Sequence, residues 1–259
     1  MIPFLFPHSP FETPTYYALY LLAFLGAILL VTKRAEAYGA SPILGIDLGM
    51  VSFLSGVLGA RLFFAFFSAP DYFLRNPIRI LYVWQGGFVL YGGLLFGILG
   101  CYFFLRSKSA SVAHWADIAA PCVLLGIGIG RMGCLSAGCC YGSQTDWLWG
   151  MVFTDPRAAA PLHIALHPTQ LLEALFGFIS CGIFAWIFRS PPRVKGSVLL
   201  WVMLAYSLFR FFIEFLRGDA IRGVFFDGRI SSSQIVAVIV ALSTSIWLLY
   251  LFKNSKRVA

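Results

Sequence analysis

The sequence contains seven apolar segments that are each long enough to cross a lipid bilayer as a helix. Such a helix needs about 20 mostly apolar residues. Hydrophobic residues make up 59% of the 259 positions and charged residues only 12%, against about 25% charged residues in a soluble protein. This composition excludes a disordered chain, a disulfide-rich secreted module and a cytosolic enzyme. We therefore predict an all-α fold: a polytopic membrane protein with one integral membrane domain over residues 1–259. The predicted spans cover residues 16–32, 43–69, 86–105, 112–140, 168–188, 196–216 and 230–252.

The basic residues indicate how these spans are oriented. All five lysines follow the first, third, fifth or seventh span, and ten of the 19 basic residues lie in these four short segments. Cytoplasmic loops carry an excess of Lys and Arg, so we expect an external N-terminus and a cytoplasmic C-terminus. We attribute the net charge of +8 to loops that face anionic lipid and expect no nucleic-acid partner. The polar residues 141–167 are then external, and their Gly, Pro and Trp content predicts a folded loop region with short interfacial or re-entrant helices.

Eight ionisable side chains lie within the predicted spans or at their ends. Ionisable groups at membrane depth are unfavourable and mark functional sites by default, although they also form ion pairs that hold helices together. The set contains no lysine, and arginine stays charged when desolvated and presents a planar fork to phosphate or carboxylate. Its members are Asp47, Arg61, Asp117, Arg131, Glu173, Arg210, Glu214 and Arg217.

Four polar residues of the sixth span form the sharpest pattern. Tyr206, Arg210, Glu214 and Arg217 are spaced by four, four and three residues, which places them on one helix face. Such a face cannot contact lipid. We expect Glu214 to orient both arginines, with the phenol of Tyr206 nearby. An anion such as a lipid phosphate is the expected ligand.

Glycine and cysteine mark two further segments. The run GIGIGRMGC at 126–134 permits either close helix packing or the approach of a ligand to the backbone. Cys134, Cys139 and Cys140 follow on the external side, where a disulfide or free structural thiols are expected. A metal site with the nearby His163 and His167 is the third possibility, but the cysteine spacing matches no standard zinc pattern. We therefore predict no metal.

Several segments, in order along the chain, resemble motifs of the prolipoprotein diacylglyceryl transferase family of the bacterial inner membrane. They are GARLFF at 59–64, VWQGGFVLYGG at 83–93, ADIAAPCVLLGIGIGRMG at 116–133, HPTQLLEALFG at 167–177, RFFIEFLRGD at 210–219 and Ser233-Gln234. The resemblance implies transfer of a diacylglyceryl group from phosphatidylglycerol to the thiol of a lipobox cysteine in prolipoprotein signal peptides. The reaction forms a thioether and releases glycerol phosphate.

The resemblance also implies roles for individual residues. The expected catalytic residues are Tyr91, Arg131 and Arg210. The expected substrate-binding residues are Gly133, Gly142, His167, Gln170, Glu173, Tyr206, Glu214 and Arg217. No cofactor is implied, and the protein is expected to be a monomer in the bilayer of the inner membrane.

The chain departs from the family pattern at two positions in these motifs. Tyr91 stands where the family has its catalytic histidine, and Cys134 stands where the family has an asparagine. A phenol is a weak base at neutral pH, so the substitution favours a second hypothesis, a non-catalytic lipid- or lipopeptide-binding protein on the same scaffold. The retained arginines and glutamates favour an enzyme. The absence of repeat symmetry between the two halves argues against a third hypothesis, a small-anion transporter.

The lysine distribution predicts the topology of the chain. Reporter fusions placed after Arg106, Arg193 and Ala259 should be cytoplasmic, and a fusion near Asp155 should be external. The measurement is the activity of a reporter that folds on one side of the membrane only. An external C-terminus would contradict the prediction.

Overall fold

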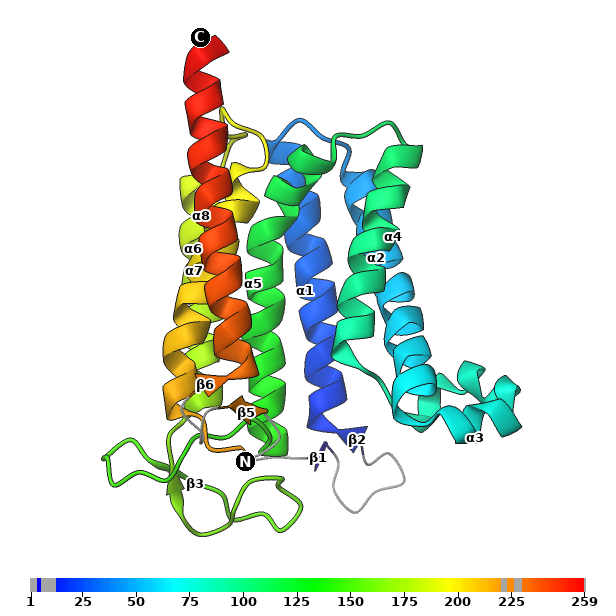
Figure 1. Ribbon diagram of the computed structural model, residues 1–259, viewed down its shortest axis with the longest axis vertical. Coiled ribbons are helices and arrows are strands. Elements are labelled where there is room, and N and C mark those ends of the chain that lie inside the picture. Colours follow the sequence, from blue (N-terminus) through cyan, green and yellow to red (C-terminus); the bar gives the residue numbers. More distant parts are fainter. Residues whose placement is uncertain (1–3, 6–12, 220–222, 226–229, 259) are drawn as a thin grey trace. The chain divides into compact units, whose positions relative to one another are not determined.

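The computed structural model describes residues 4–5, 13–219, 223–225 and 230–258 (Figure 1). Among these residues, seven helices are long and apolar enough to cross a membrane, which confirms the predicted polytopic all-α fold. Their exposed surfaces are covered by Leu, Ile, Phe and Trp side chains, as expected for helices in lipid. The spanning helices are α1 (Thr15–Ala37), α2 (Pro42–Phe63), α4 (Leu90–Ser107), α5 (Val112–Ala137), α6 (Thr169–Ile187), α7 (Ser197–Ile213) and α8 (Ser232–Val258).

Several helix ends differ from the predicted spans, and glycine explains two of them. Helix α4 begins at Leu90 and not at residue 86, because Gly86 and Gly87 have φ values of 73° and 78°. Helix α5 ends at Ala137, before Gly138 with a φ of 71°. L-residues rarely adopt positive φ values, and a residue with such a φ value cannot be part of the helix. Short elements precede α4 or extend α2 and α7: η1 (Phe64–Ser68), α3 (Pro70–Arg75), η2 (Pro77–Leu81), η3 (Val83–Gln85) and η4 (Glu214–Leu216).

The chain divides into two compact units, one formed by residues 31–115 and the other by residues 1–30 and 116–259. The boundaries fall inside α1 and α5. The expectation of one domain over residues 1–259 stays a prediction.

In the unit of residues 31–115, α2 and α4 approach each other through glycine. A Cβ atom on Gly59 would collide with the carbonyl oxygen of Gly92, and a Cβ on Gly92 with that of Gly59. Arg61, two residues further along α2, is buried and donates hydrogen bonds to five backbone carbonyls. These carbonyls belong to Arg79, Ile80, Tyr82, Gly86 and Gly87. Arg61 therefore holds the segment before α4 in place, and its charge has a structural explanation.

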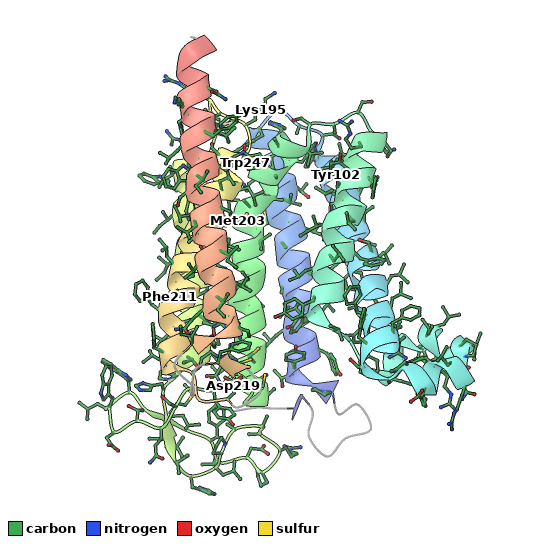
Figure 2. The ribbon with its side chains drawn as sticks, viewed as in Figure 1. Tyr102, Lys195, Met203, Phe211, Asp219 and Trp247 are labelled. Atoms are coloured by element: carbon green, nitrogen blue, oxygen red, sulfur yellow. The ribbon has the colours of Figure 1, made fainter. Side chains whose placement is uncertain are left out.

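In the other unit, α5, α6 and α7 share a hydrophobic core. The buried residues of this core are Ala120, Leu124, Cys181, Val198 and Val202. Helix α8 packs along α7 (Figure 1). Figure 2 shows Lys195 at one end of these helices and Asp219 at the other.

The loop of residues 141–167 is folded, but it contains strands instead of the predicted short helices. Strand β3 (Met151–Val152) pairs antiparallel with β4 (Ala165–Leu166) over a small core of Phe153, Ala160 and Leu166. Two other short antiparallel pairs are described, β1 (Phe4–Leu5) with β2 (Thr13–Pro14) and β5 (Val224–Phe225) with β6 (Ile230–Ser231). The loop lies at the end of α5 to α8 where β5 and β6 lie (Figure 1). Gly, Pro and Trp predicted the turns of this loop but did not distinguish strands from helices.

The buried carboxylate of Asp117 caps another helix. It accepts hydrogen bonds from the backbone N–H groups of Gly196, Val198 and Leu199, at 2.6, 2.9 and 3.2 Å, where α7 begins. The first N–H groups of a helix have no partner within the helix, and the helix dipole favours a negative charge there. Asp117 therefore fixes α7 against α5, and its place in the membrane also has a structural explanation.

This cap predicts a stability difference. Asp117→Ala should lower the free energy of unfolding by roughly 3 kcal/mol, because hydrogen bonds to a charged group contribute about 1.5–3 kcal/mol each. Asp155→Ala is the matched control: Asp155 forms an exposed ion pair with Arg157, and such pairs contribute little. Unfolding in detergent, followed by tryptophan fluorescence, measures both. Equal stability of the two variants would contradict the role of the cap.

Candidate functional site

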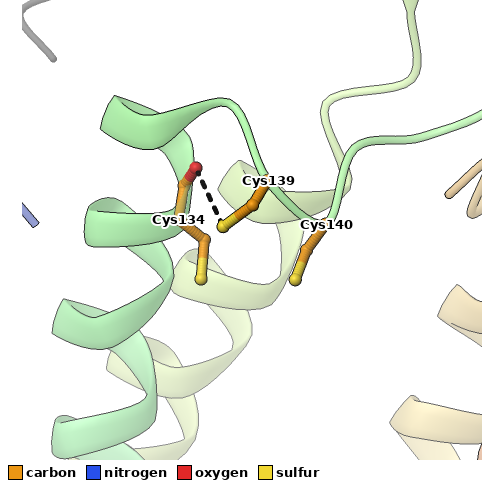
Figure 3. A group of neighbouring side chains, drawn as sticks. All are labelled: Cys134, Cys139 and Cys140. Atoms are coloured by element: carbon orange, nitrogen blue, oxygen red, sulfur yellow. Dashed lines mark hydrogen bonds between the residues drawn. The ribbon is translucent and has the colours of Figure 1, made fainter. Parts of the chain in front are cut away.

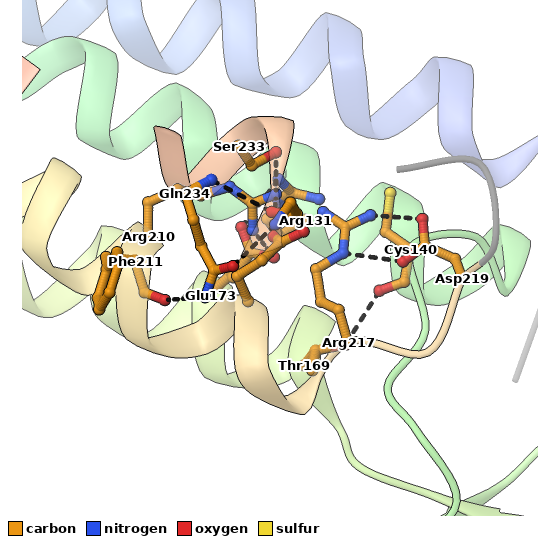
Figure 4. Close-up of polar contacts among 12 residues, drawn as sticks. Arg131, Cys140, Thr169, Glu173, Arg210, Phe211, Arg217, Asp219, Ser233 and Gln234 are labelled. Atoms are coloured by element: carbon orange, nitrogen blue, oxygen red, sulfur yellow. Dashed lines mark hydrogen bonds and ion pairs between the residues drawn. The ribbon is translucent and has the colours of Figure 1, made fainter. Parts of the chain in front are cut away.

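Two arginines and two glutamates from consecutive elements meet in one ion-pair cluster (Figure 4). Arg131 Nη2 on α5 lies 2.8 Å from Oε2 of Glu173 on α6. Arg210 on α7 places Nη1 3.7 Å from Glu173 Oε1 and Nη2 2.7 Å from Oε2 of Glu214. Glu173 thus lies between the arginines, and Glu214 holds the second of them. Below, these four residues are called the arginine–glutamate cluster.

The crossing of α5 and α6 brings the first pair of this cluster together. A Cβ atom on Gly177 would lie 2.8 Å from the Cα of Gly128, so the two backbones touch at this point. Arg131 follows Gly128 by three residues, and Glu173 precedes Gly177 by four, so both lie about one turn from the crossing. Gly128 therefore has a packing role, whereas Gly126 and Gly130 have no atom within 4 Å of a Cβ.

The start of α8 adds a partner that the sequence analysis did not assign. Ser231 and Gln234 form a reciprocal capping box: Ser231 N–H donates to Gln234 Oε1 at 2.9 Å, and Gln234 N–H donates to Ser231 Oγ at 3.2 Å. Between them, Ser233 Oγ accepts a hydrogen bond from Arg210 Nη2 at 3.2 Å. The Ser-x-x-Gln spacing was the signal that could have identified this helix start.

The arginines and the glutamates of the cluster differ in accessibility. The side chains of Glu173 and Glu214 are 0% and 1% exposed, whereas those of Arg131 and Arg210 are 18% and 13% exposed. Formal charge balances, as a buried cluster requires. The part of the cluster that remains accessible therefore belongs to the two arginine side chains, although Nη1 of Arg210 is itself buried.

Arg217 does not continue the helical face predicted for the sixth span. Helix α7 ends at Ile213, and after η4 the backbone of Arg217 is extended, with φ −78° and ψ 141°. Its Nε and Nη2 donate to the carboxylate of Asp219 at 2.8 and 2.6 Å. Burial disfavours the charged form of Arg217, but the hydrogen bonds and charge of Asp219 outweigh this and raise the pKa of its guanidinium. The expectation that Glu214 orients both arginines overlooked this partner, because the pattern assumed an unbroken helix.

Gly142 and His167 pack against each other where the external loop begins and ends. A Cβ on Gly142 would collide with the carbonyl oxygen of His167. The backbone N–H of His167 donates to the carbonyl of Ser143 at 2.9 Å, and its ring lies 5.4 Å from that of Trp147. Gly142 also forms an isolated β-bridge with Arg217. Both residues thus join the loop to the segment that carries Arg217.

Buried side chains at the start of α6 hold the two cysteines that follow α5. Gln170 Nε2 donates to the carbonyl of Cys139 at 2.9 Å, and Thr169 Oγ1 donates to that of Cys140 at 3.0 Å. The sulfur atoms of Cys134, Cys139 and Cys140 all lie within 4.8 Å of one another, and all three thiols are free (Figure 3). Of the two expected states, a disulfide or free thiols, this structure has the free thiols.

The remaining predicted site residues lie on three different helices. A Cβ on Gly133 would lie 3.3 Å from Tyr16 Cδ2, so this glycine lets α1 approach α5. Tyr206 is half-buried, with its ring 6.3 Å from that of Phe176 on α6. Tyr91 belongs to the other unit, where it is the second residue of α4 and 72% exposed.

Comparisons with known proteins support the resemblance over almost the whole chain. The sequence model of the family described as prolipoprotein diacylglyceryl transferase matches residues 3–250. A phosphatidylglycerol–prolipoprotein diacylglyceryl transferase of Oleidesulfovibrio alaskensis is 34% identical, over 99% of this chain and 96% of its own. Proteins of the same name from Clostridium tetani and Bordetella avium are 32% and 36% identical. They align over 92% and 81% of this chain, and over 93% and 79% of their own.

Proposed function

Because the chain belongs to the prolipoprotein diacylglyceryl transferase family, we propose that its arginine–glutamate cluster binds the phosphate of phosphatidylglycerol. The protein is a multi-pass enzyme of the inner membrane that transfers a diacylglyceryl group to prolipoproteins in lipoprotein biosynthesis. The enzyme is the hypothesis that we retain over a binding protein or an anion transporter.

The reaction that we assign to the site is a displacement at carbon. The thiol sulfur of a lipobox cysteine forms a bond to the glyceryl carbon, and the bond from that carbon to the phosphate oxygen breaks. The electron pair of the broken bond stays on glycerol phosphate, whose charge increases as it leaves. Arg131 and Arg210 neutralise this charge. Preorganised donors stabilise a charge that develops in the transition state more strongly than water does.

The partial exposure of the two arginine side chains, beside carboxylates that are buried, is the observation that carries this assignment. Among the described contacts of Arg131, the ion pair with Glu173 uses Nη2. A guanidinium has five N–H donors in a fixed fork, so the N–H groups of Arg131 that this ion pair does not use can donate to phosphate oxygens. Glu173 and Glu214 are positioning residues: their carboxylates set the orientation of the two forks before substrate arrives.

The other predicted residues of the same unit border this phosphate site in our proposal. We assign Arg217, Gly142 and His167 to the loop that borders it on the external side. We place Tyr206, Gly133 and Gln170 along the helices that line it. The N-terminus is external and the C-terminus cytoplasmic in this proposal, and the enzyme acts as a monomer.

Tyr91 holds the substrate by a hydrogen bond in this proposal. Its exposed phenol is available to a ligand, and it stands in the segment that resembles the family's histidine motif. A phenol donates a hydrogen bond well but is a weak base at neutral pH. A second group, or the binding of the thiol itself, must therefore account for the loss of the thiol proton.

Arg210 tests the phosphate site. Arg210→Ala should abolish transfer from phosphatidylglycerol to a lipobox peptide, and Arg210→Lys should remain poor because a point charge cannot replace a bidentate fork. Arg106→Ala, at the predicted cytoplasmic end of α4, is the matched control and should retain normal turnover. Size-exclusion profiles establish that each variant is folded. Turnover near that of the parent in either Arg210 variant would refute the assignment.

Tyr91→Phe tests the phenol alone, because it keeps the ring. It should reduce transfer by roughly 10²-fold if the hydroxyl takes part in proton transfer or its relay. Tyr91→His, which restores the family residue, should retain or increase the rate. If Tyr91→Phe matches the parent in a single-turnover assay, the phenol has no chemical role.

A further inference from the structure

Three cysteines at the end of α5 and just beyond it form a compact group of sulfur atoms, which have no role in the proposed transfer site. Cys134 lies on the last turns of α5, and Cys139 and Cys140 follow Gly138 (Figure 3). Their sulfur atoms lie within 4.8 Å of one another. Sulfur ligands of a tetrahedral zinc ion, each about 2.3 Å from the metal, lie about 3.8 Å apart. The group therefore needs to contract by only about 1 Å to bind one metal ion.

Hydrogen bonds fix the backbone that carries these thiols. Cys139 N–H donates to the carbonyl of Cys134 at 3.1 Å, which turns the chain back towards the end of α5. Cys140 adopts a φ of 58°, a conformation that costs energy for a residue with a side chain. The buried Gln170 and Thr169 bind the carbonyls of Cys139 and Cys140. These contacts keep the second and third thiols beside the first.

The charges around the thiols suit a metal–thiolate centre. Three thiolates and a divalent cation carry one net negative charge. Arg131 and Arg217 both act electrostatically on Cys140. Each also forms an ion pair with a carboxylate, Glu173 or Asp219, so they stabilise this charge by proximity and not as unpaired cations. A disulfide, by contrast, would use two of the sulfurs and leave the third without a role.

We propose that Cys134, Cys139 and Cys140 bind one thiophilic divalent cation, such as Zn²⁺, and leave its fourth position open to the acceptor thiol. This departs from our expectation of no metal, which rested on spacing in the sequence and not on the distances between sulfur atoms. Three protein ligands and one open position are the arrangement of catalytic zinc sites.

The place of this site in the fold links it to the proposed function, on which its catalytic part rests. Cys134 lies three residues after Arg131 on α5, and Gln170 lies three residues before Glu173 on α6. Residues three apart share a helix face, so the thiols lie one turn from the arginine–glutamate cluster. An acceptor thiol bound to the metal would lie next to the phosphate that leaves.

Metal binding also accounts for the thiol proton. A thiol that coordinates a metal is deprotonated, and its proton passes to bulk water as it binds. The metal-bound sulfur then forms the bond to the glyceryl carbon, while the electron pair of the carbon–oxygen bond leaves with the phosphate. No oxidant or reductant is required. Tyr91 then does not have to act as a base.

Metal binding is tested on the full-length protein in detergent, reduced and stripped with a chelator. Titration with Cd²⁺, followed by the ultraviolet sulfur-to-metal charge-transfer band, should show one strong site per chain. Cys134→Ser, Cys139→Ser and Cys140→Ser should each weaken it by at least about 10²-fold, since even second-shell changes cost 10–100-fold. Cys101→Ser, on α4, is the control and should bind like the parent. Unchanged affinity in the three variants, or a disulfide among these thiols in untreated protein, overturns the proposal.

A second measurement separates the metal from the phosphate site. Transfer to a lipobox peptide should fall by at least about 10²-fold in the stripped protein, the scale of a lost proton-transfer group, and return with Zn²⁺. Arg210→Ala should abolish transfer without changing the affinity for Cd²⁺. If stripped protein transfers as fast as loaded protein, the metal has no catalytic role while the phosphate assignment stands. If loaded parent protein shows no transfer, the proposed function fails, and the Cd²⁺ titration still decides the binding site.

Discussion

The buried carboxylate of Glu173 is the interaction on which the site depends. It lies between Arg131 and Arg210, and without it two guanidinium groups would face each other in a medium that solvates charge poorly. The glycine crossing of α5 and α6 brings this carboxylate to Arg131, and Arg210 then joins α7 to the pair. Because removal of one partner from a buried ion pair leaves an uncompensated charge, the three helices are fixed relative to one another by the groups that we propose bind the substrate.

Four charged residues of the spans form two kinds once their partners are known. Arg61 and Asp117 bind backbone groups, the first by closing a segment and the second by capping a helix, and neither presents its charge to a ligand. Arg131 and Arg210 bind carboxylates and keep part of each side chain accessible. Their partners thus distinguish the arginines that we propose bind substrate from the charges with a structural role, and the sequence alone does not show this difference.

Hydropathy predicted the seven spans because lipid permits few other structures. Helical spacing placed Arg210 and Glu214 together, because residues four apart lie on the same face of one helix. The same spacing missed Asp219 as the partner of Arg217, because the helix ends at Ile213 and the pairing depends on the backbone geometry beyond that residue. The sequence grouped the three cysteines but did not show that their sulfur atoms meet, because they do so only after the chain turns at Gly138. Local periodicity thus predicted the fold, whereas much of the site depends on contacts formed across turns.

Removal of one ion pair with its charge balance intact tests the central claim most directly. In Arg131→Gln with Glu173→Gln, two opposite charges disappear together, so the free energy of unfolding should stay close to that of the parent. Binding of fluorescent phosphatidylglycerol to the two proteins in detergent is the measurement. Our account predicts that the double variant binds this lipid at least about tenfold more weakly, since charge-assisted hydrogen bonds contribute about 1.5–3 kcal/mol each. Binding equal to that of the parent, in a protein of equal stability, would contradict it and leave the cluster with a structural role alone.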